Sequence, residues 1–549
     1  MNYKLTSTKN NFLEITFSTK VTRETTEIQL PAWRPGRYEL GNFAKNIQKF
    51  EVKDSNGNNL NFNKITKDKW VIDTQNVSEI IVIYNYYAMD FNAGSTFIGE
   101  DVLYVNPVNC FIYIPERQNE PCSVEIPINN GQQIACGGNF TNGILTTKSF
   151  HELVDTPFLV SSQLQSKTYQ VNQTDFTIWF YGECKPNWEK IIPDFTKFTK
   201  LQLEKFGDFP VKNYHFINII HPFKAYHGVE HTTSTVIVLG PSYKLMKEYY
   251  VELLGVSSHE LYHTWNIKTI RPVEMLPYDY SKENYSKLGY VAEGVTTYMG
   301  DLFLYESGVF DQKQYIVEFN KYLDKHYSND GRLNLSVADS SFDTWLDGYE
   351  MGIPNRKSSI YTEGCLVSFM IDSKIKEATN NTKSLHDVMQ KLYVDFGKKQ
   401  IGYTEQNYKE IIEEISGISF ANFFNNYIWG ANDFTSELKS CLNYVGYDLI
   451  KQKSKIYSET YGLKLITLNN KTKVIHVMQN SSANSAGLIR EDEIISINNF
   501  PIKNDLENWL EYFKNDKITL GIIRNGIIKN IELSEVNSKQ FFKYYIQKR

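Results

Sequence analysis

The 549-residue sequence has few cysteines and no long apolar run, and these absences exclude several classes of protein. No run of about 18 apolar residues exists, so no transmembrane helix is expected. The first residues contain no apolar core of signal-peptide length, which predicts a cytoplasmic protein. The six cysteines are widely spaced and form no Cys-x-x-Cys pair, so we expect neither a disulfide framework nor a cysteine-type zinc site.

A strong excess of one charge is also absent. The formal net charge is −5 and no long basic run occurs, so the sequence predicts no nucleic-acid partner. Aromatic residues make up 14% of the chain, a high share that suits large cores and peptide-binding grooves. The length predicts about three or four domains. Nothing in the sequence indicates an oligomeric state.

A His-Glu-x-x-His motif, residues 259–263, lies near the middle of the chain. Residues four apart on a helix share a face, so His259 and His263 can direct two imidazoles at one metal ion. Glu260 is one residue further round the helix and can reach a water on that metal. This arrangement is the signature of zinc hydrolases. We predict one Zn²⁺ per chain, although affinity order alone does not distinguish zinc from cobalt or manganese.

Two histidines leave such a site incomplete, because catalytic zinc takes three protein ligands and one open position. Residues 290–304 predict an apolar helix with one acidic residue, Glu293, near its start. A buried carboxylate needs a partner, so Glu293 is the best candidate for the third ligand. Asp301 lies further along the same helix. It is a possible acceptor for a ligand histidine, but we favour an ordinary polar position.

The chain divides into three regions by pattern, which together predict a multidomain α+β protein. Residues 1–168 contain short alternating runs separated by turn signals and predict a β-sandwich-like domain. Within this region, the loop 31–38 carries two prolines and a glycine, and we interpret it as a structural corner. Residues 169–452 begin with strands and continue with helical spacing. Residues 453–549 predict short strands around one helix, a module with its own core.

The last region resembles a PDZ domain. Residues 461–463 stand where the carboxylate-binding loop would be, and residues 485–488 and 491–498 match the most specific run of that family. PDZ domains capture an extended peptide or a C-terminus by adding it to a sheet edge. A purely structural lid or packing module is an equally open interpretation.

The whole chain resembles the glycyl aminopeptidase family of zinc metallopeptidases, which are gluzincins. The resemblance implies a thermolysin-like catalytic domain with a helical C-terminal half, preceded by a β domain and followed by a PDZ domain. It also implies Glu293 as the third ligand. The residues that carry it are 31–38, 228–231, 259–266, 293–298, 361–364 and the PDZ-like tail.

The resemblance further implies roles for three residues outside the metal motif. Tyr361 would donate to the oxyanion that forms during hydrolysis. Glu230 would bind the free α-ammonium of the substrate through charge-assisted hydrogen bonds. Gly228 would let the backbone come close to a substrate strand. The family also implies a preference for N-terminal Gly or Ala. Glu363 departs from the family pattern, in which Lys is frequent.

The sequence therefore predicts an aminopeptidase acting on peptide substrates, with two alternatives open. An endopeptidase on the same scaffold would cleave N-terminally blocked peptides and would not need Glu230. A non-catalytic protein would bind peptides through the PDZ-like tail. The intact His259, Glu260 and His263 argue against this second alternative.

Overall fold

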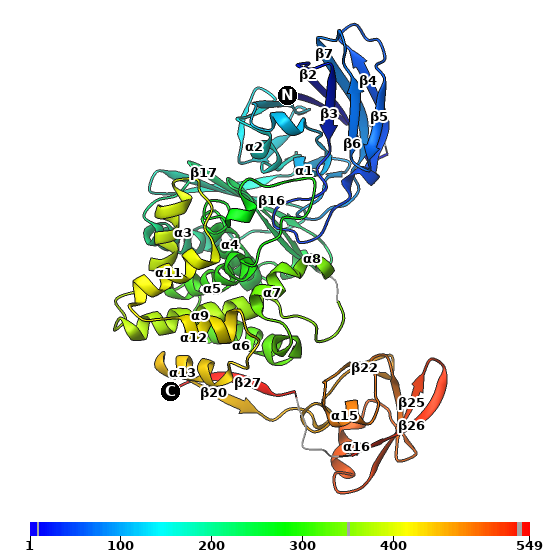
Figure 1. The fold of residues 1–549 in the computed structure, drawn as a ribbon, viewed down its shortest axis with the longest axis vertical. Helices are drawn as coiled ribbons and strands as arrows, with labels where there is room; N and C mark the ends of the chain where they lie inside the picture. The colour runs from blue at the N-terminus through cyan, green and yellow to red at the C-terminus, as the bar shows by residue number, and fades with distance from the viewer. Residues whose placement is uncertain (8–9, 349–351, 535–540) are drawn as a thin grey trace.

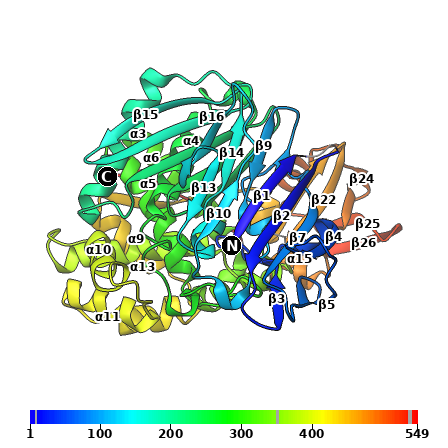
Figure 2. The ribbon, with the colours of Figure 1, turned by 90° about the horizontal axis from the view of Figure 1, so that it is seen from above.

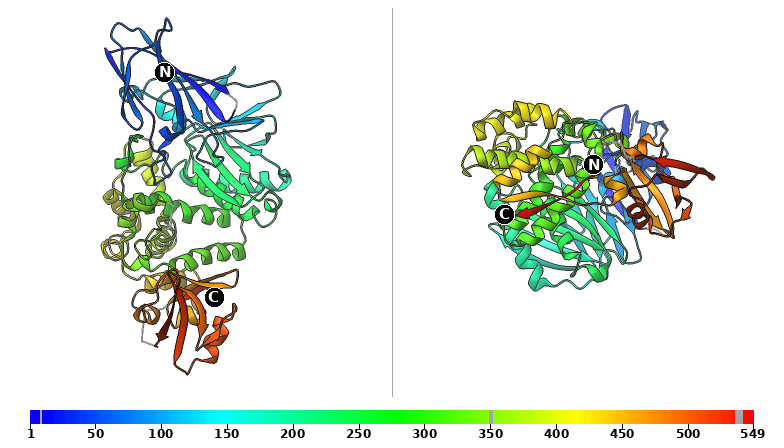
Figure 3. Two further views of the ribbon diagram at one scale, coloured as in Figure 1. Left: turned by 90° about the vertical axis from the view of Figure 1, so that its right-hand side faces the viewer. Right: turned by 90° about the horizontal axis from the view of Figure 1, so that it is seen from below.

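The computed structural model describes residues 1–7, 10–348, 352–534 and 541–549. Three parts follow one another along the long axis: a β-rich N-terminal part, a central part in which helices cover a sheet, and a C-terminal module (Figure 1). Figure 3 shows the same succession from a second direction. The predicted multidomain α+β architecture with a β-rich N-terminal domain is confirmed. Among the described residues, no helix has the length and apolar character needed to cross a membrane.

The N-terminal part is built on a seven-stranded sheet with one buried face. In β2 the buried side chains are Leu13, Ile15 and Phe17, two residues apart, as a half-buried strand requires. A three-stranded sheet packs on this face, and the rings of Phe50 and Trp70 stack 4.6 Å apart between the two sheets. The seven strands are, in order, β12 (Asn139–Thr141), β13 (Ile144–Thr147), β10 (Cys122–Glu125), β1 (Asn2–Ser7), β2 (Phe12–Lys20), β7 (Glu79–Tyr87) and β4 (Ile47–Asp54). The three are β3 (Thr25–Gln29), β6 (Lys69–Asp73) and β5 (Phe62–Thr66).

A four-stranded sheet joins the N-terminal part to the central part. Its Tyr104 shares an apolar cluster with Ile217 of the central five-stranded sheet, and Figure 2 shows the strands of both parts from above. The boundary expected after residue 168 falls inside β15, a strand of the central sheet, so the two parts share a core there. The four strands are β11 (Gln133–Cys136), β14 (Phe158–Ser161), β9 (Val102–Val105) and β8 (Phe97–Ile98). The five are β15 (Gln165–Val171), β16 (Thr174–Tyr181), β17 (Asn213–Ile220), β19 (Ser234–Gly240) and β18 (Ala225–Glu230).

Helices fill the rest of the central part. The helix α4 packs between the edge of the central sheet and α5, and α9 lies at the centre of the helices, in contact with α5, α6, α7, α10, α11 and α13. The helices are α3 (Trp188–Phe206), α4 (Tyr250–Tyr262), the π-helical turn η5 (Tyr290–Val295), α5 (Thr296–Glu306), α6 (Gln312–Tyr327), α7 (Val337–Phe342), α8 (Thr344–Asp347), α9 (Ile360–Ala378), α10 (Leu385–Leu392), α11 (Glu405–Ser416), α12 (Ala421–Phe423) and α13 (Thr435–Tyr444). Two short helices, α1 (Pro107–Cys110) and α2 (Phe150–Val154), belong to the N-terminal part.

The C-terminal module has a core of its own, to which Leu463, Val474, Ile494 and Leu520 contribute from four strands. Its strands run in the order β21, β22, β23, β25 and β26, with β24 paired to β23, so β21 is an edge strand. The bounds are α14 (Ile456–Glu459), β21 (Leu463–Leu468), β22 (Lys471–Val477), α15 (Ser482–Ser485), β23 (Glu493–Ile497), β24 (Phe500–Pro501), α16 (Leu506–Tyr512), β25 (Ile518–Arg524) and β26 (Ile527–Leu533).

The chain does not end in this module: the expected range 453–549 includes a last strand that lies on the central part. The last strand, β27 (Lys543–Lys548), pairs antiparallel with β20 (Tyr447–Gln452) of the central part. Ile546 packs into the central core, and the ring of Tyr544 lies 4.2 Å from that of Tyr327. The buried apolar side of β27 therefore returns the chain to the central part, and the module is an insertion between two paired strands.

Candidate metal and peptide site

Three side chains from two helical segments converge on one point. The Nε2 atoms of His259 and His263 lie 3.0 Å apart, and Glu293 Oε2 lies 3.8 Å from the first and 3.4 Å from the second. All three ligand-type atoms lie within 4.8 Å of one another. Two imidazole nitrogens and a carboxylate oxygen are a donor set typical of catalytic zinc. The structure thus brings together the three residues that the sequence predicted for a metal site.

The tautomer of His263 suits a metal ligand. Its Nδ1 lies 2.7 Å from the backbone oxygen of Asn266. Because a carbonyl oxygen only accepts, Nδ1 donates this hydrogen bond, and the neutral ring then offers a lone pair at Nε2. A backbone acceptor of this kind fixes ring orientation at metal sites.

Glu293 lies in the π-helical turn η5, a rare form of helix that is frequently found at functional sites. The side chain of Asn266 donates to the backbone oxygens of Val291, at 2.9 Å, and Ala292, at 3.3 Å. The segment just after the metal helix is therefore bonded to the turn that carries Glu293. This cross-connection sets the distance between the acid and the two histidines.

Tyr361 reaches the site because η5 and α9 touch backbone to backbone. A Cβ on Gly294 would overlap the Cα of Gly364, so only glycine fits at this crossing. Tyr361 lies about one turn before Gly364, at the head of α9, and lines the cavity that also contains His259 and Glu293. Residues 293–298 and 361–364 therefore lie side by side because Gly294 and Gly364 allow their backbones to touch.

Gly228 on the edge strand β18 lies against the acid of the motif. A Cβ at this position would overlap Glu260 Oε1, so the strand passes close to that carboxylate only because the residue is glycine. Glu260 itself is buried, and its Oε2 has no hydrogen-bond partner among the described residues. The sequence analysis expected Gly228 to let the backbone come close to a substrate strand, and in the structure the missing Cβ also leaves room for Glu260.

Burial raises the pKa of Glu260 to about 8, and the nearby carboxylates of Glu230 and Glu293 add to the rise, while His263 and Arg34 oppose it. A carboxyl group whose pKa lies near neutral pH suits a general base. Burial would also raise the pKa of Glu293, but hydrogen bonds from His259 and His263 lower it to about 2. The pKa of Glu260 is therefore raised and that of the neighbouring Glu293 is lowered.

The loop 31–38 forms a wall of the site, which corrects the interpretation of this loop as only a structural corner. Tyr38 donates to Glu293 Oε1 at 3.3 Å. Gly36 has a φ of +77°, and a Cβ there would overlap Glu230 Oε2. Arg34 lies 3.5 Å from His227 Nε2. Charged and aromatic side chains in a loop with two prolines were the sequence feature that could have indicated this role.

Glu230 ends β18 and is backed by a buried ion network that the sequence analysis missed. Asp155 Oδ1 lies 2.7 Å from Lys268 Nζ and 3.2 Å from His231 Nδ1, while Asp155 Oδ2 accepts from the backbone nitrogen of Thr232 at 2.9 Å. Asp155 belongs to the N-terminal part and Lys268 to the segment after the metal helix. The network therefore joins three segments directly behind Glu230. No local sequence pattern links residues so far apart.

The cavity has a volume of about 980 Å³ and extends from Gly36 and Glu230, past the three metal-type ligands, to α6. At the α6 end, Asp301 Oδ2 accepts from the hydroxyl of Tyr322 at 2.9 Å. Burial, with Glu318 nearby, raises the pKa of Asp301 to about 7. Asp301 is thus bonded to a tyrosine, as the interpretation of an ordinary polar position implies.

Glu363 points into the helical interior. Its Oε1 and Oε2 lie 2.8 and 2.9 Å from Nδ1 of the fully buried His326. The ring of His326 in turn stacks on Phe434, with 4.5 Å between centroids. The departure from the family pattern at residue 363 therefore coincides with a histidine partner for the acid.

Comparison with known proteins gives a family for this fold and site. The sequence model of the M61 glycyl aminopeptidase family matches residues 252–367, and that of the peptidase M61 N-terminal domain matches residues 2–162. No curated protein matches the chain by sequence.

Solved structures resemble the chain as well. An aminopeptidase N family protein from Idiomarina loihiensis is similar at a TM-score of 0.90 with 23% identity, over 100% of this chain and 98% of that one. An M1 zinc metallopeptidase from Deinococcus radiodurans is similar at a TM-score of 0.48 with 13% identity, over 79% of this chain and 94% of that one. With the two family domains in place around the His-His-Glu group, the chain belongs to the M61 glycyl aminopeptidase family and is a peptidase.

Proposed function

We propose that the protein is a zinc-dependent aminopeptidase that removes N-terminal residues, preferably Gly or Ala, from peptides. Glu230 is the observation that carries this proposal. Its carboxylate lies in the same cavity as His259, His263 and Glu293, and the loop 31–38 closes against it. A buried acid beside metal-type ligands suits the free ammonium group of a substrate, which it binds through charge-assisted hydrogen bonds.

We assign the metal ligands as His259, His263 and Glu293, a gluzincin-type set. The donor chemistry and the hydrogen bond that leaves Nε2 of His263 free both fit zinc. When bound, zinc polarises the scissile carbonyl and lowers the pKa of a water molecule towards about 7.

Glu260 acts as the general base in this proposal. Its carboxylate takes a proton from the attacking water and passes it to the leaving amine. Gly228 allows the carboxylate to sit beside β18, and burial keeps its proton affinity high. Tyr361, at the head of α9, donates its phenol hydrogen to the oxyanion of the tetrahedral step.

We further propose that the C-terminal module is a PDZ domain. The edge position of β21, which begins at Leu463, the last residue of 461–463, supports this assignment, because such domains add a peptide to an exposed strand. The alternative is a packing module. It predicts that the full chain carrying Glu260→Gln shows no binding that requires a free C-terminal carboxylate on the peptide. Calorimetric titration with free-acid and amidated forms of one peptide distinguishes the two.

The test of the main proposal is hydrolysis of chromogenic glycyl and alanyl amides before and after chelation. Glu260→Gln should retain metal but lose activity, and Glu248→Gln, an exposed acid outside the cavity, is the matched control. N-acetylated versions of the same amides should resist cleavage. Cleavage of blocked peptides with free amides left intact would establish an endopeptidase instead. Absence of both metal and hydrolysis would contradict the enzyme mechanism and leave peptide binding by the module.

A further inference from the structure

Three cavities of the structure meet at Tyr361. The active-site cavity, described above, contains Lys325 and Tyr361. A second cavity of about 360 Å³, the bridging cavity, also contains both, together with Asn329, Ser359, Thr362 and Glu363. A third cavity of about 390 Å³, the module cavity, shares Asn329, Ser359 and Tyr361 with the second. The shared residues make the three cavities neighbours in a row.

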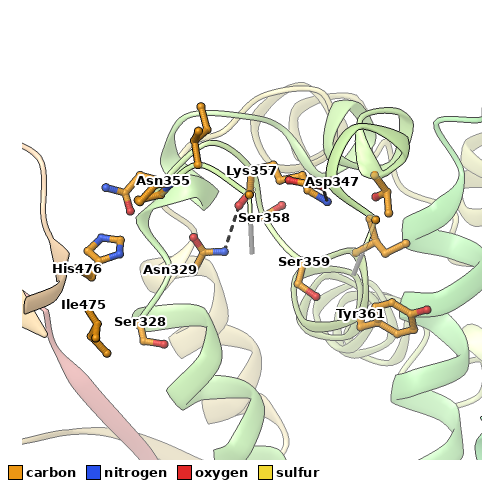
Figure 4. Close-up of a pocket in the computed structure, with 16 residues that line it drawn as sticks. Ser328, Asn329, Asp347, Asn355, Lys357, Ser358, Ser359, Tyr361, Ile475 and His476 are labelled. Atoms are coloured by element: carbon orange, nitrogen blue, oxygen red, sulfur yellow. Dashed lines mark hydrogen bonds and ion pairs between the residues drawn. The ribbon is translucent and has the colours of Figure 1, made fainter. Parts of the chain in front are cut away.

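The far end of this row lies on the C-terminal module. Ile475 and His476, on β22, line the module cavity opposite Tyr361 (Figure 4). Ser328 and Asn329, at the end of α6, lie between them in the same view. The row of cavities therefore begins at the metal-type ligands and ends at a strand of the module.

The module is held in place at this rim. His476 Nε2 lies 3.1 Å from Asp330 Oδ1, and both side chains are mostly buried. Lys464 donates to the backbone oxygen of Ser328 and lies 4.6 Å from the centre of the Phe541 ring. These contacts, one from β21 and one from β22, hold the module against the segment that follows α6, so the cavity has a fixed wall on the module side.

The lining suits an extended peptide. Ile353 and Ile475, which line the module cavity, are 70% and 40% exposed and offer apolar contacts to a bound chain. Asn355 provides a side-chain amide next to them, whereas the amide of Asn329 is bonded to the backbone of Lys357 and Gly331. Lys325, at the junction of the first two cavities, is exposed and makes no ion pair among the described residues.

The direction of the row matches the direction of a substrate. In the proposed function, Glu230 and the loop 31–38 hold the N-terminus on the side of the N-terminal part. The remainder of the peptide must then leave the metal site on the other side. The module lies at the opposite end of the molecule from the N-terminal part (Figure 1).

We propose that the C-terminal remainder of a peptide substrate passes Tyr361, runs through the bridging and module cavities and contacts β22 at Ile475. This inference rests on the proposed aminopeptidase function and adds a substrate class to it. The enzyme acts best on peptides long enough to reach the module, and short amides use only the active-site cavity.

The test is a series of peptides of increasing length, each incubated with the metal-loaded enzyme. All begin with Gly-Ala, and Ala-Ser units extend them from dipeptides to about ten residues. Each added residue lengthens an extended peptide by about 3.3 Å. We expect kcat/KM to rise with length by about tenfold, mainly through KM. Ile475→Asp should abolish most of this rise and leave dipeptide hydrolysis unchanged. Ile528→Asp is the matched control, because Ile528 is a 69% exposed isoleucine of the same module that lines none of the three cavities.

Binding of the same peptides to Glu260→Gln, followed by calorimetry, gives a readout that needs no turnover. A constant kcat/KM across the series, or equal losses in Ile475→Asp and Ile528→Asp, would overturn the inference while the proposed function stands. Failure of the wild type to cleave any member of the series, dipeptides included, would overturn the proposed function and with it the inference.

Discussion

The active-site cavity and the module cavity are walled by different kinds of contact. In the first, Gly228 lies against Glu260, Gly36 lies against Glu230, and Tyr38 is bonded to Glu293. In the second, the module meets the end of α6 through Lys464 of β21 and His476 of β22. In the active-site cavity, glycine backbone packs directly against carboxylates, whereas at the module cavity the contacts are made by side chains at its edge.

This difference teaches what each region has to do. Hydrolysis requires reacting groups placed to within a fraction of an ångström, and close backbone packing allows little movement. Guiding the rest of a peptide requires only that a surface stays within reach. We therefore expect changes at the active-site cavity to be costly and changes at the module rim to be mild.

The largest effect is expected for Asp155→Asn. This change leaves the ammonium of Lys268, whose side chain is 2% exposed, without its buried ion partner. Removal of one partner of a buried pair costs about 3–5 kcal/mol of unfolding free energy. Chemical denaturation of both chains measures it. The control is Asp101→Asn, because within the described part of the chain this acid accepts from the hydroxyl groups of Ser161, Ser162 and Tyr181 and pairs with no cation. A loss below 1 kcal/mol would show that the network does not brace the site.

Asp155 should also make the stability of the protein depend on pH. Burial would raise the pKa of Asp155, but Lys268 and His231 hold it well below its usual range. An acid with a lowered folded-state pKa stabilises the fold above its unfolded value, about pH 4, and this stabilisation is lost as the pH falls towards the folded-state value. In metal-free protein, the wild type should therefore lose more stability than Asp155→Asn between about pH 5 and pH 2. Parallel curves for the two chains would refute the assignment.

A smaller effect, on activity alone, is expected for Gly228→Ala. The added Cβ would overlap Glu260 Oε1, so the carboxylate must move, and displacement of a general base costs about 10²-fold in kcat. Gly255→Ala is the matched control, since its Cβ would lie 4.0 Å from the nearest atom, Asp301 Oδ1, in the same cavity. Steady-state kinetics and metal content should be measured together. Equal kcat in both variants would mean that Glu260 needs no fixed position.

Tyr38→Phe should have a milder effect, on metal affinity. The change removes the hydrogen bond to Glu293 Oε1, and loss of a group that orients a ligand typically weakens metal binding by about tenfold or more. Competition with a chromophoric chelator measures the dissociation constant. Tyr322→Phe, which removes a similar bond to Asp301 in the same cavity, should leave the constant unchanged. A matching shift in both variants would argue against Glu293 as a ligand.

The smallest effect is expected at the module rim, for Lys464→Met. The chain loses the hydrogen bond to the backbone oxygen of Ser328 and the contact between the ammonium group and the Phe541 ring. We expect a change in unfolding free energy within about 1 kcal/mol and unchanged hydrolysis of short amides. Thermal unfolding and the amide assay together check this. A collapse of dipeptide activity would mean that the module supports the metal site directly, against the contrast drawn above.

Several elements followed from the sequence because their cause is local. Alternation in residues 12–17 predicts the buried face of β2, and helical spacing places His259 and His263 on one face of α4. The end of the module did not follow, because β27 pairs with a strand about 100 residues away in the chain. The loop 31–38 looked like a corner for the same reason: its partners, Glu230 and Glu293, are distant in sequence.

By itself, the sequence determined the four-residue spacing that places the imidazoles of His259 and His263 one helical turn apart, with the acid Glu260 beside them, because helix geometry converts sequence distance directly into spatial distance. Only the tertiary structure decided which acid completes the group, which glycines lie against Glu260 and Glu230, and where the cavities lead. These features depend on how segments far apart in the chain pack, and packing is fixed by the shape and burial of all the contacting side chains together rather than by any local pattern.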